Sequence, residues 1–319
     1  MDAFRAARRV VIATNPTAGS GRAEARVKRL CSELAQHGLR ASISTDLGHV
    51  AGLVEQHAAS RQLRAVIAAG GDGTVAELLN RLPEGVPLAV LSAGTENLLA
   101  RYLRVSADPR RVAKMVAEGE HVRLDAGRAN GRLFVLMASC GFDAEVVERV
   151  HARRQGPISR WSYAKPILES IRNYEYPQLR IHCGGPVLSE SDADCIDARW
   201  AFVFNMPCYG GGLRLAPQAR ADDGQLDLCA FREGGLWRGL QYASQVALRR
   251  HARSNECYVR RAGSIRIESE GRVPYQLDGD PAGELPLELE VVPGRMTLIA
   301  PGSTAARLAS ARAQLATTA

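Results

Sequence analysis

The run GGDGT at residues 70–74 has the composition of a phosphate-binding turn. Five small or branched apolar residues precede it, and apolar residues at helix spacing follow it over 75–82, so it lies between a strand and a helix. Glycines leave the unpaired N–H groups of a helix start open to an anion. Asp72 would repel phosphate unless a divalent cation lay between them, which indicates a magnesium-bound nucleotide. A tight turn capped by Asp72 and Thr74 is an equal alternative.

Two further loops of small polar residues follow predicted strands. The loop NPTAGSG, residues 15–21, comes after the first strand, and SAGTEN, residues 92–97, comes after the fourth. Because the carboxyl ends of parallel strands share one edge of a sheet, we expect the three loops to form one phosphate-binding mouth. Ordinary turns are the alternative, since Gly, Asn, Pro and Ser favour turns for local reasons.

The elements that must position these loops alternate between strand and helix patterns over residues 1–125. This alternation predicts an α/β nucleotide-binding domain with a mostly parallel sheet covered on both faces. Short strands separated by Gly, Pro, Asn and Asp dominate residues 126–300 and predict a β-rich, sandwich-like domain. We interpret residues 301–319 as a tail that forms a helix returning to the first domain. The active site is expected in the cleft between the two domains.

Composition limits the kind of partner and compartment. The formal charge of +7 favours acidic partners, but neither aromatic stacking platforms nor a reading helix supports nucleic-acid binding. The 7 cysteines form no CxxC pair, which argues against a zinc site or a disulfide framework and for a reducing cytoplasm. No stretch resembles a signal peptide or reaches a membrane span, so we expect a cytoplasmic protein that meets membranes only at their surface.

Five motifs occur in the order and approximate spacing of the diacylglycerol kinase catalytic domain family, and the chain resembles that family from about residue 9 to residue 300. The motifs are NPTAGSG, AAGGDGTVAELLN, SAGTENLLAR, YGGGLRLAPQARADDGQLDL and QLDGD. The family includes bacterial lipid kinases and the sphingosine and ceramide kinases. The resemblance implies a first domain like that of NAD kinase and phosphofructokinase, and transfer of phosphate from ATP to a lipid hydroxyl. Diacylglycerol is the first expected acceptor.

The resemblance also implies the residues that bind ATP and magnesium. Most of these line the ATP site, two lie beside it, and Asp72 holds the metal ion. They are Asn15, Pro16, Thr17, Ala18, Gly19, Thr45, Gly70, Gly71, Asp72, Gly73, Thr74, Thr95 and, beside the site, Glu96 and Asn97.

A lipid hydroxyl needs a base to take its proton. Many members of the family use a Glu in a DGE turn, and Asp280 of LDGD stands at the matching position with a side chain one methylene shorter. Asp278 could assist or replace it. Asp125 matches an acid that the family places near the base, where it would orient the base or a water. A plain hairpin turn is the alternative at 278–280, because Asp-Gly between extended runs is a turn signal.

The adjacent acids Asp222 and Asp223 could hold a hard cation together with backbone carbonyl oxygens. By resemblance, Asp223 and the main-chain oxygens of Arg220 and Gln225 would form a structural magnesium site, away from the transferred phosphate. A solvated acidic turn is an equal alternative.

The segment 149–168 is basic and carries Trp161 and Tyr163, which suits an anionic membrane surface. A solvated basic helix is the alternative, and a homodimer is left open. Leu98 departs from the Asp that diacylglycerol kinases commonly carry there, so a sphingoid base or ceramide remains an alternative acceptor. An NAD kinase and a non-catalytic nucleotide or lipid sensor are further alternatives.

Overall fold

The computed structural model of the protein describes residues 4, 6–14, 22–153, 170, 174–184, 194–210, 215–235, 238 and 256–318 of the 319-residue chain. The chain divides into two compact units, Met1–Leu124 with Gly294–Ala319, and Asp125–Pro293. The ranges predicted from the sequence place residues 294–300 in the second domain, whereas the structure places them in the first unit. The physical reason is that this stretch pairs with a strand of the nucleotide-binding sheet, as described next.

The first unit is built on a parallel sheet. Its strand order is β2 (Arg40–Ser44), β1 (Arg9–Thr14), β3 (Leu63–Gly70), β4 (Pro87–Ser92) and the second half of β16 (Leu287–Ala300). All neighbours are parallel, and every residue of β3 and β4 is buried. Gly70 stands opposite Ser92 in the register, so β3 and β4 end side by side at one edge of the sheet.

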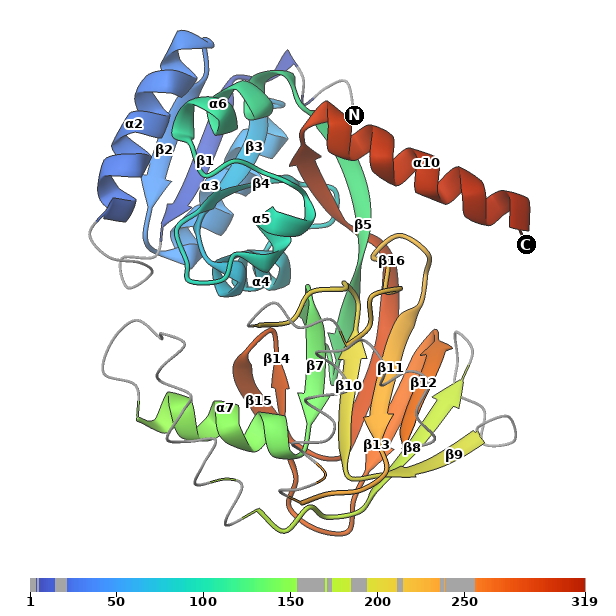
Figure 1. Cartoon of the computed structure of the whole chain (residues 1–319). Helices are drawn as coiled ribbons and strands as arrows, with labels where there is room; N and C mark the ends of the chain where they lie inside the picture. Colours follow the sequence, from blue (N-terminus) through green and yellow to red (C-terminus); the bar gives the residue numbers. More distant parts are fainter. Residues whose placement is uncertain are drawn as a thin grey trace. The chain divides into compact units, whose positions relative to one another are not determined.

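Helices cover both faces of this sheet. On one face, α2 (Arg22–Gln36) and α6 (Pro109–Glu118) pack together on alternate strand residues such as Ile12 and Ile67, and Figure 1 shows the two helices side by side. On the other face, α3 (Leu47–Ala59) contacts α4 (Asp72–Arg81). The short α5 (Leu98–Tyr102) and the terminal α10 (Gly302–Thr318) complete the unit. The prediction of an α/β domain is therefore confirmed.

The second unit contains an antiparallel sheet of six strands. Their order is β12 (Cys257–Ala262), β11 (Leu226–Phe231), β10 (Trp200–Phe204), β7 (Met137–Cys140), β14 (Pro274–Leu277) and β15 (Asp280–Glu284). The helix α7 (Phe142–Ala152) contacts β7, β14 and β15. This arrangement fixes the hairpin of β14 and β15 against one helix.

A second set of strands faces this sheet across a shared core. It contains the first half of β16, β13 (Ser264–Glu268), β8 (Leu179–Gly184) and β9 (Asp194–Ala198), with β5 (Glu120–Ala129) and β6 (Arg132–Phe134) attached. Side chains from both sets, such as Val203 and Ile265, form one hydrophobic cluster. Two antiparallel sheets around a single core make a sandwich, which confirms the β-rich prediction for this unit.

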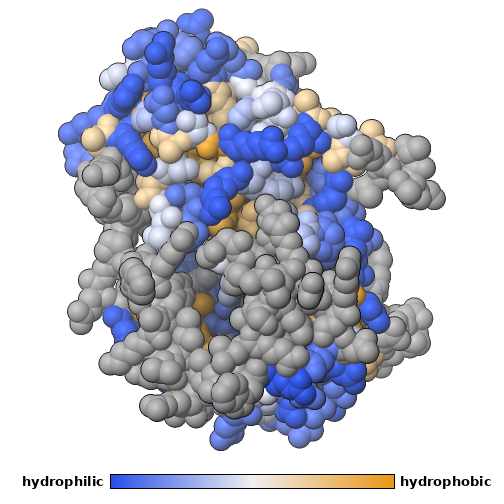
Figure 2. Space-filling view, in the orientation of Figure 1, coloured by the Kyte–Doolittle hydropathy of each residue, from blue (hydrophilic) through white to orange (hydrophobic). Residues whose placement is uncertain are grey.

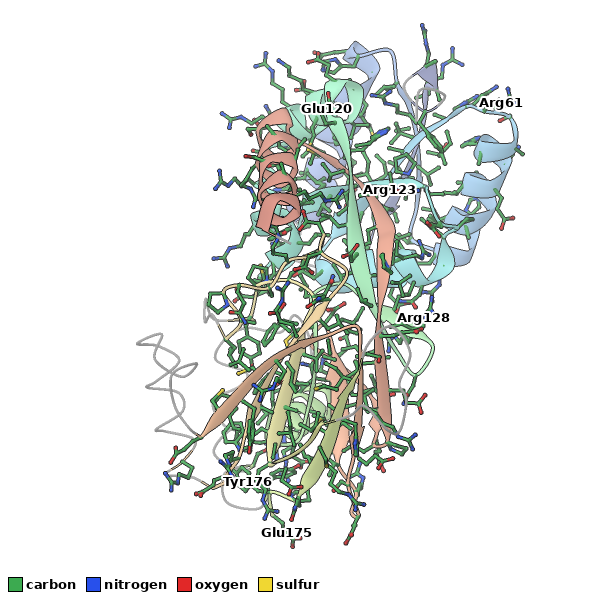
Figure 3. The ribbon with its side chains drawn as sticks, turned by 90° about the vertical axis from the view of Figure 1, so that its right-hand side faces the viewer. Arg61, Glu120, Arg123, Arg128, Glu175 and Tyr176 are labelled. Carbon is green, nitrogen blue, oxygen red and sulfur yellow. The ribbon has the colours of Figure 1, made fainter. Side chains whose placement is uncertain are left out.

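Two strands, β5 and β16, contribute residues to both units. Arg123, in the first-unit part of β5, lies 4.0 Å from a carboxylate oxygen of Glu84. Arg128, in the second-unit part, pairs with Glu290 of β16 at 2.6 Å. Figure 3 labels both arginines along β5. Each end of the strand is thus tied by its own ion pair within its own unit.

The described surface on the face drawn in Figure 2 is mostly hydrophilic, with small scattered hydrophobic areas. Within the described ranges, Ile43 is the one large apolar side chain that is exposed. None of the helices in this part of the chain is both long enough and apolar enough to cross a membrane. Of the basic segment 149–168, only residues 149–153 are described, so Trp161 and Tyr163 lie outside the described residues.

Candidate active site

The loops that follow β3 and β4 touch each other through glycine. A methyl carbon built on Gly94 would lie 2.6 Å from the Gly71 Cα atom, and one built on Gly71 would lie 3.3 Å from the Gly94 Cα atom. The Ala93 N–H also donates to the Gly70 carbonyl oxygen at 3.0 Å. Only residues without a side chain allow two backbones to approach so closely. The glycines therefore join two of the three loops that the sequence places at this edge.

Asp72 opens α4 and binds the start of another helix. Its Oδ2 accepts the Leu98 N–H at 2.8 Å, and its Oδ1 accepts the Leu99 N–H at 3.0 Å. Burial raises the pKa of Asp72, and these two backbone N–H groups oppose that rise. The carboxylate thus caps α5, whose first N–H groups have no partner within the helix. Each oxygen keeps a further lone pair, so magnesium binding by Asp72 stays a prediction.

Asn97 closes the loop after β4 on itself. It has a left-handed backbone with φ 48° and ψ 51°. Its side-chain Oδ1 accepts the Gly94 N–H at 3.0 Å, and its Nδ2 donates to the Gly94 carbonyl oxygen at 2.6 Å. Asparagine tolerates this conformation better than most residues. The backbone of the predicted ATP loop is thereby held by its own side chain.

The remaining predicted ATP residues are placed as follows. Thr74 is buried, and Gly73 is half-buried in the first turn of α4. Thr45 and Thr95 are exposed, and Glu96 lies 3.6 Å from Arg101. The residues Asn15, Pro16, Thr17, Ala18 and Gly19 lie outside the described residues.

Arg26 is a residue of this edge that the sequence analysis does not single out. From α2, its Nη1 donates to the Ser92 carbonyl oxygen at the end of β4, at 2.8 Å. A guanidinium beside these candidate phosphate-binding loops would supply positive charge and directional donors. The available signal was its position five residues after Gly21, in the helix that follows the first glycine loop.

In the second unit, β14 and β15 are joined by the two-residue turn Asp278-Gly279, with φ values of 53° and 92°. Asp278 uses both carboxylate oxygens within the protein. Its Oδ2 accepts the Val135 N–H at 2.7 Å, and its Oδ1 accepts the N–H groups of Leu136 and Met137 at 2.7 and 3.0 Å. Asp278 thus anchors the bend between β6 and β7, and its predicted catalytic role stays a prediction.

Asp280 is partly exposed. Its side chain is 42% exposed, and its Oδ1 lies 3.5 Å from Nε2 of His151 in α7. The same Nε2 lies 3.2 Å from the Gly279 carbonyl oxygen. The carboxylate of Asp280 is therefore partly open to solvent. His151 gave no signal in the sequence, because a single histidine without a recognisable partner is not informative.

A buried glutamine holds the turn from the other side. Gln276 accepts the Gly279 N–H on Oε1 at 2.7 Å. Its Nε2 donates to Ser139 Oγ at 2.8 Å and to Asp143 Oδ2 at 3.3 Å. Asp143 also accepts the hydroxyl groups of Ser139, at 2.5 Å, and of Tyr209. These contacts join the turn to the first turn of α7.

The acidic loop 220–227 contains paired charges. Arg220 forms a forked contact with Asp222 at 3.0 and 3.1 Å. Arg261 of β12 contacts Asp223, and its Nε lies 3.7 Å from Asp227 Oδ1. Asp125 is buried here, where its Oδ2 accepts the Gly224 N–H at 2.8 Å. The structure therefore places Asp125 against this loop; its role beside the base stays a prediction.

The charge and donors of this loop bear on the predicted magnesium site. Burial raises the pKa of Asp227 to about 6, and its Oδ2 is buried without a hydrogen-bond partner among the described residues. Burial also raises the pKa of Asp223, while Arg261 opposes that rise. The loop therefore brings together several carboxylate oxygens, which are the ligands that a hard cation prefers. However, no group of three or more acidic, His or Cys side chains in the described part is arranged as a metal site.

Gln225 contributes its N–H to Asp223 Oδ1, at 3.1 Å. This bond fixes the loop backbone on which the predicted main-chain ligands lie. The binding of a metal ion by Arg220, Asp223 and Gln225 stays a prediction.

Known proteins resemble the chain along most of its length. The sequence model of the diacylglycerol kinase catalytic domain family matches residues 9–129. The sequence model of the YegS C-terminal NAD kinase beta sandwich-like domain family matches residues 136–300. A protein of Mycobacterium tuberculosis named diacylglycerol kinase is 29% identical over 301 residues, which cover 92% of this chain and 95% of the relative. A diacylglycerol kinase of Staphylococcus carnosus is 24% identical over 284 residues, covering 88% and 90%.

The fold also resembles a solved structure. The crystal structure of a candidate diacylglycerol kinase from Bacillus anthracis superposes with a TM-score of 0.72. The two sequences are 24% identical, and the match covers 93% of this chain and 97% of the other. At that identity the likeness supports the two-domain fold.

Proposed function

Since the chain belongs to the diacylglycerol kinase catalytic domain family and is a lipid kinase, we propose that it transfers the γ-phosphate of ATP to the hydroxyl group of diacylglycerol. The observation that carries the proposal is the turn at 278–280. Asp278 is committed to three backbone N–H groups, while the neighbouring Asp280 keeps an exposed carboxylate. A rigid turn that presents one acid is what a base for a hydroxyl group requires.

The first unit would bind ATP at the edge where β3 and β4 end. We expect the N–H groups at the start of α4 to bind phosphate oxygens, because the first N–H groups of a helix have no partner within it and the N-cap residue here is Gly71, which has no capping side chain. Arg26 lies at the same edge and would offset the charge of the phosphates. Asp72 would hold a magnesium ion, which neutralises phosphate charge when bound. The loop of 15–19 would complete the mouth.

At the acceptor, Asp280 would take the proton of the lipid hydroxyl as its oxygen bonds to the γ-phosphorus. The bond from that phosphorus to the bridging oxygen breaks at the same time, and ADP leaves. Phosphoryl transfer depends mainly on positioning and on neutralising charge, so the base needs a fixed place more than unusual basicity. Asp278 supplies that fixed place through its hold on the backbone of residues 135–137.

The acidic loop would hold a second, structural magnesium ion. Asp223 and the main-chain oxygens of Arg220 and Gln225 are the proposed ligands. Support comes from the buried Oδ2 of Asp227, which accepts no hydrogen bond from the described residues, and from the neighbouring carboxylates of Asp222 and Asp223. The ion would stabilise the loop and take no part in the transfer.

Diacylglycerol resides in a bilayer, so the enzyme must reach a membrane surface. We propose peripheral contact through the basic segment 149–168, for which the sequence is the support. A sphingoid base or ceramide is the second candidate acceptor. Leu98, whose backbone N–H binds Asp72, favours it, because diacylglycerol kinases commonly place an acid at this position and sphingosine kinases do not.

Incubation of the purified protein with labelled ATP and magnesium tests the proposal. Mixed micelles would contain diacylglycerol, sphingosine, ceramide or no lipid, and Asp280→Asn would be assayed in parallel. We expect label in diacylglycerol and at least about 100-fold less in the variant. Label only in sphingosine or ceramide would show that this lipid, and not diacylglycerol, is the acceptor. Label in none of the lipids, with ATP binding intact, would contradict the kinase assignment for these substrates.

A further inference from the structure

The last turn of α7 carries His151, whose Nε2 lies between two acceptors of the 278–280 turn. It is 3.2 Å from the Gly279 carbonyl oxygen and 3.5 Å from Asp280 Oδ1. The imidazole is 20% exposed and the Asp280 carboxyl 42% exposed. With its proton on Nε2, a neutral imidazole donates to the carbonyl and lies at contact distance from the carboxylate. One side chain therefore contacts both the backbone of the turn and its exposed acid.

The turn is held at its opposite side by Gln276, which accepts the Gly279 N–H at 2.7 Å. Gln276 in turn donates to Asp143 at 3.3 Å, in the first turn of α7. The N–H and the carbonyl of Gly279 are thus both fixed from the same helix, by Asp143 through Gln276 and by His151 directly. Only the second of these contacts also reaches the carboxylate.

The shorter acid in this chain makes such a contact important. The side chain of Asp280 has one rotatable bond fewer than that of a glutamate. The distance from its Cα atom to its carboxylate can therefore vary less. The place of its carboxylate follows closely from the backbone of the turn. Misplacement of a reacting group by about 1 Å can cost about 100-fold in rate. His151 bonds to the Gly279 carbonyl oxygen and lies beside the Asp280 carboxylate, so it limits the displacement of that carboxylate.

We propose that His151 is the positioning residue of Asp280, and that it holds the aspartate where the lipid hydroxyl is deprotonated. The proposal rests on Asp280 being the base. Its role differs from that of Asp278, which anchors the turn to the bend of 135–137. Loss of the Nε2 donor would leave the fold and the substrate sites in place and lower the rate of the chemical step.

Two variants at this position separate a hydrogen-bond role from a packing role. Gln can place its Nε2 donor near that of the imidazole, whereas Leu has similar bulk and no donor. We expect His151→Leu to lower kcat about 10- to 100-fold, with both KM values within about 2-fold, and His151→Gln to recover most of that loss. His182→Ala, a histidine of β8 in the same unit, serves as the matched control and should keep wild-type kcat. Thermal unfolding of each variant reports folding.

The same substitutions in the Asp280→Asn background complete the test. If His151 acts through Asp280, His151→Leu will not lower the residual rate of Asp280→Asn further. Equal kcat values for His151→Leu and the wild type would overturn the proposal, as would a full additional loss in the Asp280→Asn background. If His151→Leu does not fold, a kcat of His151→Gln below that of a folded His151→Ala would overturn it. An inactive wild type, or an Asp280→Asn variant with full activity, would refute the proposed function instead.

Discussion

The backbone of Gly94 lies against that of Gly71, so closely that a methyl carbon on Gly94 would come within 2.6 Å of the Gly71 Cα atom. The two residues belong to loops that follow different strands, β3 and β4. Asp72 adds a second link, since its carboxylate accepts the N–H groups of Leu98 and Leu99 beyond the same loop. Together these contacts fix the distance between two candidate phosphate-binding loops.

We expect Gly94→Ala to weaken ATP binding. The added methyl must push the two loops apart, because its nearest neighbour is backbone, and overpacking of this kind costs about 1–3 kcal/mol. The KM for ATP should rise about 10-fold, as measured by steady-state kinetics. Gly52→Ala is the control, since Gly52 lies in α3 with no atom within 4 Å of the added carbon. Equal ATP affinity in the wild type and Gly94→Ala would contradict a nucleotide site at this edge.

Asp278→Asn should destabilise the protein. An amide offers one oxygen to backbone N–H groups that the carboxylate serves with two, so its NH₂ group would face a donor. Loss of a charged acceptor and one unsatisfied donor cost about 2–4 kcal/mol. Denaturant unfolding would measure this. Asp280→Asn, two residues away and partly exposed, should unfold near the wild-type midpoint; equal destabilisation by both changes would show that Asp278 is not the special anchor.

Asp227 should make stability depend on pH. Burial raises its pKa from 3.8 to about 6, so between these values the folded protein holds a proton that the unfolded chain releases. The free energy of unfolding therefore falls as the pH rises from about 4 to 6, and it has fallen by its full amount once the pH exceeds the pKa of Asp227 in the folded state. The amide of Asp227→Asn does not ionise, so the variant avoids this loss. Its free energy of unfolding at pH 8 should exceed that of the wild type by at most about 3 kcal/mol.

The advantage of Asp227→Asn should vanish near pH 4, where the wild-type carboxyl is protonated in the folded state. Thermal unfolding in EDTA across this range is the measurement, because EDTA removes any bound cation. A stability difference that stays constant from pH 4 to pH 8 would disagree with a raised pKa for Asp227.

Arg261→Met should make the acidic loop dependent on magnesium. The change removes the guanidinium that contacts Asp223 and lies 3.7 Å from Asp227 Oδ1. Because Arg261 is 39% exposed, we expect a loss of about 1–2 kcal/mol in EDTA, below the value for a fully buried pair. Added Mg²⁺ should raise the Tm of the variant more than that of the wild type. Arg261→Lys, which keeps the charge, is the control, and an unchanged Tm of both variants with and without Mg²⁺ would rule out a cation in this loop.

The fold class could be predicted because the signals that define it are local. Apolar periodicity and glycine turns distinguish the strand and helix alternation of residues 1–125 from the short strands that follow. The second half of β16 could not be assigned to the first unit in this way. Its parallel register with β4, in which Leu298 stands opposite Leu88, joins segments 210 residues apart that share no local pattern.

The candidate site was predictable in residue type and less so in partners. The glycines and Asp72 were apparent from composition at a strand end, but the N–H groups that Asp72 binds come from residues 98 and 99 across a loop. Asp278 and Asp280 are alike in sequence and differ only once the backbone of 135–137 is placed beside one of them. Such distinctions depend on tertiary contacts, which a single sequence does not specify.

The place of β16 also determines the order in which the protein can fold during synthesis. The strand that pairs with β4 contains Thr297 and Leu298, so the ribosome makes all of the second unit before it. At bacterial or eukaryotic translation rates this takes about 10–40 s after β4 has emerged. For that interval the edge of β4 has no strand beside it, and an open edge is a template for pairing with other chains. The nascent nucleotide-binding unit therefore exposes this edge of β4 until its last strand arrives.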